Sequence, residues 1–239
     1  MIWHFTETLT ELNLAKDLFD LFGEELQRLG LMVNEGKIID ASFVEAPRQR
    51  NSREENKEIK QGQGDELWQD KPNKKRQKDT DARWTKKNSQ NHYGYKNHTK
   101  TDSKSKLINT YKVSDASVHD SQVVDDLLDE SDMGQDLYAD SAYVGQDDVL
   151  DKHKVNDQIH EKGYKNKPLT ESQKARNKEK SKTRVRVEHV FGFMENSMGG
   201  MFFRKVGKKR AETTIGLMNL TYNMFRKIQL TEPIMGTCA

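Results

Sequence analysis

The stretch Lys37-Ile-Ile-Asp-Ala-Ser-Phe-Val44 has apolar residues at both alternating positions of an extended chain. A strand with this pattern is buried on both faces, as in a sheet with helices above and below it. Asp40 stands in its middle, where an ionised carboxylate is costly unless a cation, a metal or several donors compensate it. The stretch therefore predicts a central strand that carries a compensated acid.

The segments on either side of this strand differ in kind. Before it, apolar residues recur at three and four residues and predict an amphipathic helix within residues 1–35, with Asn13 as a plausible cap. After it, residues 45–90 are polar and basic with almost no aliphatic content, which predicts an insertion or mobile loop outside the core. The apolar positions of the predicted N-terminal helix are Leu14, Leu18, Phe22, Leu26 and Leu29.

Helical and extended patterns alternate through the rest of the chain. They predict a hairpin, a short helix, a strand, a helical turn, a last strand and two long helices, which together favour an α/β domain with a mixed sheet. The expected ranges, in the same order, are 92–99 with 107–113, 121–130, 137–141, from 145, 155–161, 170–196 and 208–227. We expect a helical N-terminal segment at 1–36, one domain at 37–207, and a C-terminal helix and tail at 208–239.

The composition excludes several classes of protein. The apolar runs are too short for a membrane span or a signal peptide, so we expect a soluble cytoplasmic protein. The one cysteine, Cys238, allows neither an internal disulfide nor a thiolate metal site.

The charges are sorted along the chain. The formal net charge is +2, but residues 45–112 carry +8, residues 113–151 carry −12 and residues 152–210 carry +11. Two basic segments around an acidic centre are typical of a protein that binds a polyanion with its flanks and a cation in the middle. Solvated surface helices would give the same counts, so both interpretations stay open.

Three acidic residues have apolar neighbours: Asp40, Asp140 after Leu137-Tyr-Ala139, and Glu188 beside Val187. Each alone is ordinary, because a strand Asp is often hydrogen-bonded and Glu188 could pair with Arg184 one helical turn earlier. If two neighbouring strands and a packed helix bring them together, they form an oxygen-ligand site for Mg²⁺ or Mn²⁺. Two such ions activate an oxygen nucleophile and stabilise the leaving oxygen at phosphorus, which predicts a phosphodiester substrate.

The segments around these acids resemble bacterial insertion-sequence transposases of the DDE type, in the insertion-sequence five family. The similar segments are Ile38-Ile-Asp-Ala-Ser-Phe-Val-Glu-Ala-Pro47, Tyr138-Ala-Asp-Ser-Ala-Tyr-Val-Gly145 and Arg184-Val-Arg-Val-Glu-His-Val-Phe-Gly192. The resemblance implies a ribonuclease H-like fold, with Asp40, Asp140 and Glu188 as catalytic residues and ligands of two Mg²⁺ ions.

The chain departs from the family pattern in three respects. Ser181 stands where the wider superfamily has a tyrosine, and Glu195 where it has a basic residue, while Arg184 matches the family's arginine. The family's usual N-terminal domain for recognising the element ends is expected to be missing, because only about forty residues precede Asp40.

Further residues are candidates for contact with DNA, because clustered cations release counterions on meeting phosphates and aromatic rings stack on unpaired bases. Trp84 could equally anchor the insertion. His119 with Asp120 could orient a water or a metal ligand, but a helix cap is the commoner use of an aspartate such as Asp120. The DNA-binding candidates are Arg184, Lys180, Lys182, Arg186, Lys96 and Trp84.

The sequence thus predicts a transposase that cleaves element ends and transfers the strands into target DNA. Its expected partners are the terminal inverted repeats, target DNA and further copies of itself, on the bacterial nucleoid and not at a membrane. The alternatives are a nuclease of the same fold that only hydrolyses DNA, and a truncated, inactive DNA-binding remnant.

Overall fold

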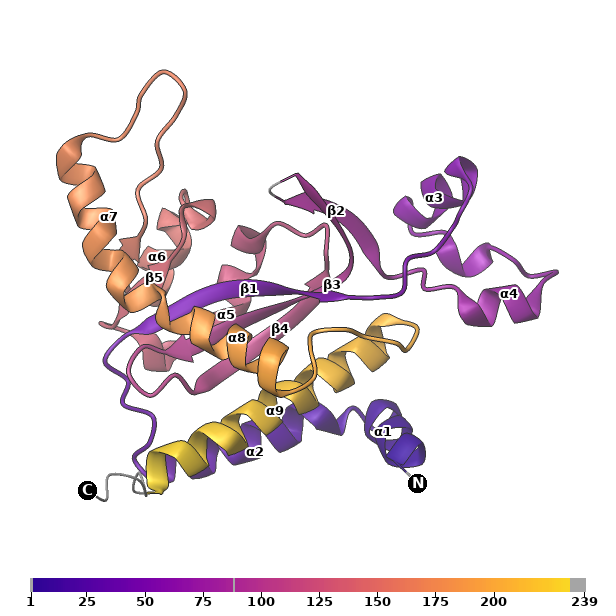
Figure 1. Cartoon of the computed structure of the whole chain (residues 1–239), viewed down its shortest axis with the longest axis horizontal. Helices are drawn as coiled ribbons and strands as arrows, with labels where there is room; N and C mark the ends of the chain where they lie inside the picture. The colour runs from indigo at the N-terminus through magenta and orange to yellow at the C-terminus, as the bar shows by residue number, and fades with distance from the viewer. Residues whose placement is uncertain (1, 88, 233–239) are drawn as a thin grey trace.

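The stretch that opens at Lys37 forms the central strand of a six-stranded mixed sheet in the computed structural model, which describes residues 2–87 and 89–232 (Figure 1). The strands are β1 (Lys37–Glu45), β2 (Arg83–Lys87), β3 (Gln90–Asp102), β4 (Ile108–Asp115), β5 (Asp136–Ala139) and β6 (Asn156–Ile159). The strand order is β2-β3-β1-β5-β6, with β4 also paired to β3. Strands β3 and β4 run antiparallel in a hairpin beside β1, whereas β5 and β6 run parallel to β1 and to each other.

Helices cover both faces of this sheet. The helices are α1 (Ile2–Glu11), α2 (Leu14–Arg28), α3 (Arg53–Lys60), α4 (Pro72–Gln77), α5 (Val124–Leu127), α6 (Asp147–His153), α7 (Glu171–Arg184), α8 (Arg186–Ser197) and α9 (Lys208–Thr231). Among the short 3-10 turns, η2 (Asp120–Val123) directly precedes α5 and η4 (Ser141–Tyr143) follows β5 in the sequence. A mixed sheet of this order with helices on both faces fits a ribonuclease H-like fold.

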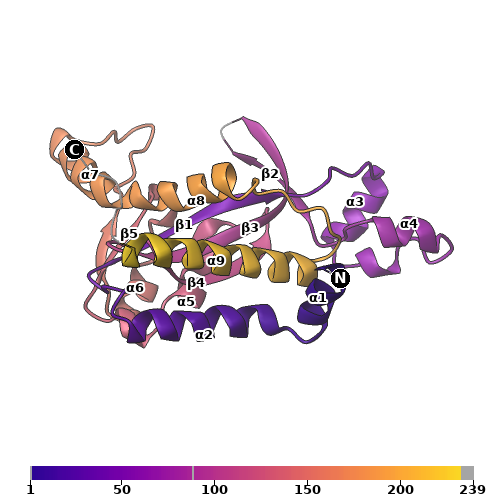
Figure 2. The same cartoon turned by 60° about the horizontal axis from the view of Figure 1, so that its bottom comes forward.

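The two adjacent isoleucines of β1 belong to different cores, as alternation along a strand requires. Ile38 lies in the larger cluster, which α2, α8 and α9 complete, and Figure 2 shows these three helices side by side. Ile39 lies in a second cluster formed with α5, α6, β5 and β6. The prediction of a central strand buried on both faces is therefore confirmed.

Three details of the predicted elements are wrong. The N-terminal segment forms two helices, because Asn13 adopts a left-handed conformation (φ 55°) and makes no side-chain cap. The buried face of α2 also differs in part from the predicted one: Leu26 is buried as expected, but Phe19 is buried in addition, while Leu14 and Leu18 remain partly exposed. The long helix expected over 170–196 is interrupted at Val185 and divides into α7 and α8.

The polar segment 45–90 also contains more structure than expected, namely α3, α4 and β2. Ser52 and Glu55 form a capping box at the start of α3. The Glu55 carboxylate then accepts hydrogen bonds from Trp68 Nε1 and Lys74 Nζ, each at 2.6 Å. Polar contacts thus order a segment that has few aliphatic residues.

No helix within residues 2–87 and 89–232 is long and apolar enough to cross a membrane. Cys238 and the end of the predicted C-terminal tail lie outside the described residues.

Candidate carboxylate site

Asp40 and Asp140 come from neighbouring parallel strands that run in step. Lys37 pairs with Leu137 and Ile38 with Tyr138, so the two aspartates lie two residues further along their own strands. Asp40 is still within β1, whereas Asp140 directly follows β5 and caps η4, where its Oδ1 accepts a hydrogen bond from Ala142 N at 2.7 Å. Two acids one hundred residues apart in the sequence thus face the same end of the sheet.

Arg184 connects the first aspartate to Glu188. Its Nη1 donates to Asp40 Oδ2 at 3.0 Å, and its Nη2 donates to Glu188 Oε1 at 3.1 Å. The interruption at Val185 lies between the two residues, at the end of α7 and the start of α8. Glu188 is held by this ion pair with its side chain 55% exposed.

The positive charge at the site compensates Asp40 only in part. Burial raises the pKa of Asp40 to about 6, and the nearby Asp140 carboxylate adds to the rise. The hydrogen bond from Ala41 N and the positive charge of Arg184 act in the opposite direction and only partly offset the burial. A cation beside Asp40 and Asp140 would therefore be stabilised electrostatically.

Tyr143 brings a hydroxyl group to the same place. The residue is 1% exposed, and its hydroxyl has no hydrogen-bond partner among the residues that the structure describes. Asp40, Asp120 and Asp140 raise its pKa further, after burial, so the hydroxyl stays protonated and can donate. A protonated donor suits an oxygen ligand or a water bound near these acids.

The residues present fit a hard divalent cation in part. Mg²⁺ and Mn²⁺ prefer oxygen ligands. The carboxylates of Asp40 and Asp140, whose negative charge is only partly compensated, are ligands of this kind, and the buried Tyr143 hydroxyl can donate a hydrogen bond beside them. Among residues 2–87 and 89–232, however, no three His, Cys, Asp or Glu side chains are arranged to hold a metal ion. The structure brings Asp40 and Asp140 together and leaves Glu188 on Arg184.

His160 was missed by the sequence reasoning, although it directly follows the third parallel strand, β6. Its Nε2 lies 3.3 Å from the Ser181 hydroxyl of α7. Burial, then Arg184 and Lys180, lower the pKa of His160, while Asp140 raises it. Its place after a strand parallel to β1 and β5 was the signal that could have found it, because the carboxyl ends of parallel strands share one edge of a sheet.

Two of the residues singled out from the sequence, Lys96 and His119, make contacts within the protein. Lys96 is 7% exposed, and its ammonium donates to Asp120 Oδ1 at 2.8 Å and to Val118 O at 2.6 Å. The His119 side chain caps η2, where its Nδ1 accepts from Ser121 N at 3.3 Å. Lys96 is therefore not accessible to DNA in this structure. A helix cap is present as expected, but His119 forms it and not Asp120, whose carboxylate pairs with Lys96.

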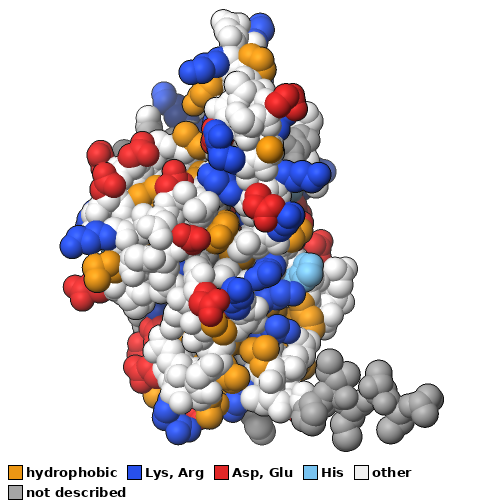
Figure 3. Space-filling model, turned by 90° about the vertical axis from the view of Figure 1, so that its left-hand side faces the viewer, with side chains coloured by type: hydrophobic (Ala, Val, Ile, Leu, Met, Phe, Trp, Pro, Cys, Tyr) orange, Lys and Arg blue, Asp and Glu red, His pale blue; other side chains and the backbone are white. Residues whose placement is uncertain are grey.

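The basic residues of α7 lie on a helix with no buried residue, which projects from the body of the molecule (Figure 1). Lys182 pairs with Glu179 at 2.5 Å, and Lys180 Nζ donates to Ile159 O at 2.8 Å. Arg186, on α8, donates to Ser103 O at 2.6 Å. Figure 3 faces this end of the molecule and shows Lys and Arg side chains along the projection and on the surface below it.

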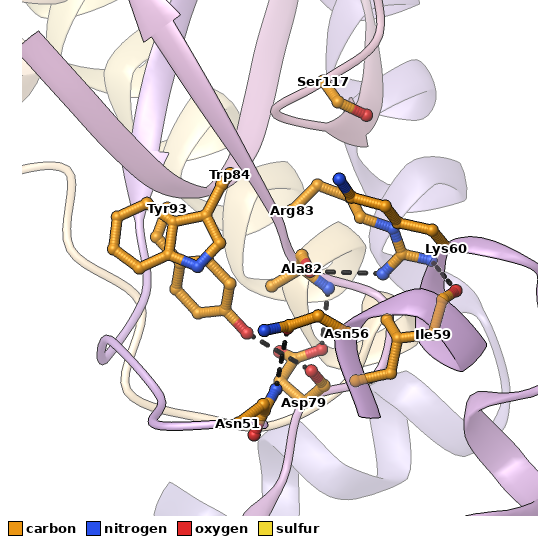
Figure 4. Close-up of a pocket in the computed structure, with 10 residues that line it drawn as sticks. All are labelled: Asn51, Asn56, Ile59, Lys60, Asp79, Ala82, Arg83, Trp84, Tyr93 and Ser117. Carbon is orange, nitrogen blue, oxygen red and sulfur yellow. Dashed lines mark hydrogen bonds between the residues drawn. The ribbon is translucent and has the colours of Figure 1, made fainter. Parts of the chain in front are cut away.

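Trp84 lies away from the carboxylates, on β2 beside a pocket next to α3 (Figure 4). Its ring is 5.0 Å from that of Tyr93, and the Arg48 guanidinium lies 5.7 Å from it.

The fold and the acid pair define an α/β domain that fits a ribonuclease H-like fold and has two aspartates at the ends of parallel strands. The family profile described as transposase DDE domain matches residues 33–224, and the chain belongs to this family.

The transposase for insertion sequence element IS1106 of Neisseria meningitidis serogroup B is 33% identical over 190 residues. These residues make up 77% of this chain and 62% of that protein, so the chain spans about three fifths of its relative's length. No solved structure gives a significant match.

Proposed function

We propose that this chain is a transposase that cleaves the DNA ends of an insertion sequence and transfers the freed strands into target DNA. The observation that carries the proposal is the pair Asp40 and Asp140, in step on adjacent parallel strands of a transposase DDE domain. The proposal includes membership of the insertion-sequence five family. It also includes assembly of several copies on the element ends, on the bacterial nucleoid.

In this proposal Asp40, Asp140 and Glu188 are the catalytic carboxylates and hold Mg²⁺ or Mn²⁺. When bound, a pair of such ions activates an oxygen nucleophile and stabilises the leaving oxygen at phosphorus. Asp40 and Asp140 already lie together, and Glu188 joins them when its carboxylate leaves Arg184. Arg184 then has a free guanidinium beside the site, suited to a phosphate oxygen.

The chain's other residues bind and orient the DNA. The exposed cations of α7, Lys182 among them, contact the sugar-phosphate backbone, and Lys180 and Arg186 flank the carboxylates from α7 and α8. Such contacts position a duplex without reading its sequence. Trp84 contacts DNA at a place away from the carboxylates. Lys96 is not among the proposed DNA contacts, because its ammonium is buried against Asp120.

The test is Asp140→Asn, with supercoiled plasmid that carries the DNA flanking this reading frame as substrate. Loss of a residue that only orients a metal ligand typically costs about 10- to 100-fold, so we expect loss of a direct ligand to lower Mg²⁺-dependent nicking at least about 100-fold. Asp148→Asn, a nearby exposed acid on α6, is the matched control and should keep its activity. Full nicking by the Asp140→Asn protein, with thermal stability unchanged, would exclude this site.

Analysis of the products separates the proposal from its two rivals. Joined target DNA appears only with strand transfer, nicked DNA alone indicates a nuclease, and binding without cleavage under Mg²⁺ or Mn²⁺ indicates an inactive remnant.

A further inference from the structure

A pocket of about 370 Å³ opens between β2, β3 and α3, in the part of the chain where the sequence predicted a loop (Figure 4). Ile59, Ala82 and Tyr93 line it with buried apolar surface. Trp84 forms one wall and is 44% exposed, so a large part of its indole remains available for contact. The pocket therefore offers aromatic surface to a flat ligand.

The rim of the pocket is polar and basic. Asn51 and Asn56 bring their amides to it. Lys78 donates to Asn51 Oδ1 at 2.7 Å, and Asn51 Nδ2 donates to Asn56 Oδ1 at 3.5 Å, so the two amides are held together. Arg83 is fixed by donating to Ile59 O at 3.1 Å, and its charge remains in the wall. Lys60 adds an exposed cation on α3. The amide nitrogen of Asn56, which can donate, and the neighbouring cations suit a ligand with a hydrogen-bonding edge and a negative charge.

Asp79 is the acidic residue in the pocket wall, and its carboxylate is hydrogen-bonded to donors of the protein. Its two oxygens accept from the Tyr95 hydroxyl at 2.9 and 2.8 Å, and from Ala82 N at 3.0 Å. Gly207 N donates to it from the start of α9, at 3.1 Å. Since these donors already stabilise the charge of Asp79, this acid repels an anionic ligand less than a free carboxylate would.

We propose that this pocket binds a single unpaired nucleobase of the DNA, with Trp84 stacked on its face. A nucleobase has the flat face and the hydrogen-bonding edge that the pocket matches, and its phosphate supplies the negative charge. A paired base is enclosed by its neighbours in the duplex, so only an extrahelical or single-stranded nucleotide can enter. The volume is near the lower end of ligand pockets, about 300–1,000 Å³, which suits one nucleotide and not a base pair. The inference rests on the proposed function, which makes DNA the partner.

The sheet places the pocket within reach of the carboxylate site. Asp40 pairs with Thr99 on β3, and Tyr93 pairs with Trp84, so these side chains share one face of the sheet. Thr99 and Tyr93 are six positions apart on β3, or about 20 Å at the usual rise of a strand. At about 3.4 Å per nucleotide, the unpaired base lies roughly six nucleotides from the phosphate at Asp40.

The test compares two short DNA duplexes of equal sequence, one with a single extrahelical thymine and one fully paired. Binding is measured by fluorescence anisotropy at fixed salt, with EDTA present so that no cleavage occurs. We expect the unmodified protein to bind the bulged duplex about tenfold more tightly, within the range that base stacking on an aromatic side chain contributes. Trp84→Ala should abolish this preference, so that both duplexes bind equally, and Trp84→Phe should retain most of it.

Trp3→Ala is the matched control, because Trp3 is an exposed tryptophan on α1, away from the pocket. Replacing the extrahelical base by 5-iodouracil gives a second measurement, since its photocrosslink should map to the peptide that holds Trp84 or Tyr93. Equal affinity for both duplexes, a preference that survives in Trp84→Ala, or a crosslink outside the pocket would overturn the inference and leave the proposed function intact. Failure to bind either duplex would contradict both.

Discussion

Asp40 carries a charge that its surroundings compensate only in part. Burial raises its pKa from 3.8 to about 6 in the folded chain. A carboxyl whose pKa is higher when folded binds its proton more tightly in that state, so this residue makes the fold less stable as the pH rises from about 4 to about 6. Above that range the ionised side chain costs at most about 3 kcal/mol.

Asp40→Asn should therefore stabilise the metal-free protein at neutral pH. We expect the free energy of unfolding at pH 7.5 to rise by about 1–3 kcal/mol, and its pH dependence between about 4 and 6 to become flatter. Urea unfolding in EDTA at several pH values measures both. Asp126→Asn, which removes an exposed acid paired with Lys112, should change stability by less than about 0.5 kcal/mol. A less stable Asp40→Asn protein at pH 7.5 would mean that the ion pair with Arg184 outweighs the burial.

At the scale of residues, the sequence singled out the two aspartates that lie in step on β1 and β5, but not the residues around them. Asp40 and Asp140 could be found from the sequence, because each is an acid next to an apolar run, and an acid in such a place needs a compensating partner. Tyr143 and His160 give no such signal, since an aromatic residue in a turn and a histidine after a strand are common. Their meaning depends on which charges lie beside them, and only the packing of η4, β6 and α7 determines that.

At the scale of elements, the pairing of β1 with β3 depends on one close approach. Gly94 has φ +146°, and a Cβ placed on it would lie 2.3 Å from Val44 O and 2.8 Å from Ala46 N. Backbone atoms cannot yield as the end of a side chain can. Residue 94 must therefore be glycine for β1 and β3 to pair along their full length, from Lys37 to Glu45.

Gly94→Ala should destabilise the protein by about 3 kcal/mol or more, because strained backbone and overpacking act together. Gly23→Ala is the matched control: Gly23 lies in α2, and a Cβ there would have no atom within 4 Å. This change should be neutral or stabilise by up to about 1 kcal/mol, since alanine is the better helix former. Chemical unfolding of both variants measures the difference, and similar losses in the two would contradict the role given to Gly94.

The types of the elements followed from sequence patterns more reliably than their ends and faces did. Alternating and helical periods predicted β1, the hairpin of β3 and β4, and α9. They did not predict the interruption at Val185, because Val185 belongs to an otherwise continuous helical pattern. In α2 the small residues Ala15 and Gly23 are buried and Leu21 is exposed, so packing against α9 overrode the leucine pattern.

At the scale of the whole molecule, the sorted charges meet within the fold. Acids from the segment 113–151 pair with lysines from the basic blocks, as in the bond from Lys100 Nζ to Asp132 Oδ2 at 2.6 Å, where both side chains are buried. Lys96 with Asp120 and Lys152 with Asp125 are further pairs of this kind. Part of the acidic block therefore serves internal ion pairs, which block counting alone could not separate from a site for cations.

Hydrogen bonds between two buried amides join α9 to the central sheet. Asn97 of β3 and Asn219 of α9 are both 0% exposed. They exchange two hydrogen bonds, from Asn97 Nδ2 to Asn219 Oδ1 at 2.8 Å and from Asn219 Nδ2 to Asn97 Oδ1 at 3.1 Å. The two residues are 122 positions apart in the sequence, and each is the hydrogen-bond partner of the other. The pair therefore connects the central sheet to the last helix of the described chain.

Replacing either asparagine by alanine leaves the other amide buried without its partner, so each single change should cost about 2–4 kcal/mol. The double variant Asn97→Ala with Asn219→Ala removes both polar groups together and should cost about 1–2 kcal/mol less than the sum of the single changes. Urea unfolding of the four proteins measures this coupling. Asn97→Ala combined with Asn177→Ala is the control, because Asn177 lies on α7 and bonds to Glu161, and these two changes should add within about 0.5 kcal/mol. If the first pair is also additive, α9 is held to the sheet by its apolar contacts, such as that of Ile215 with the larger core, and not by the amides.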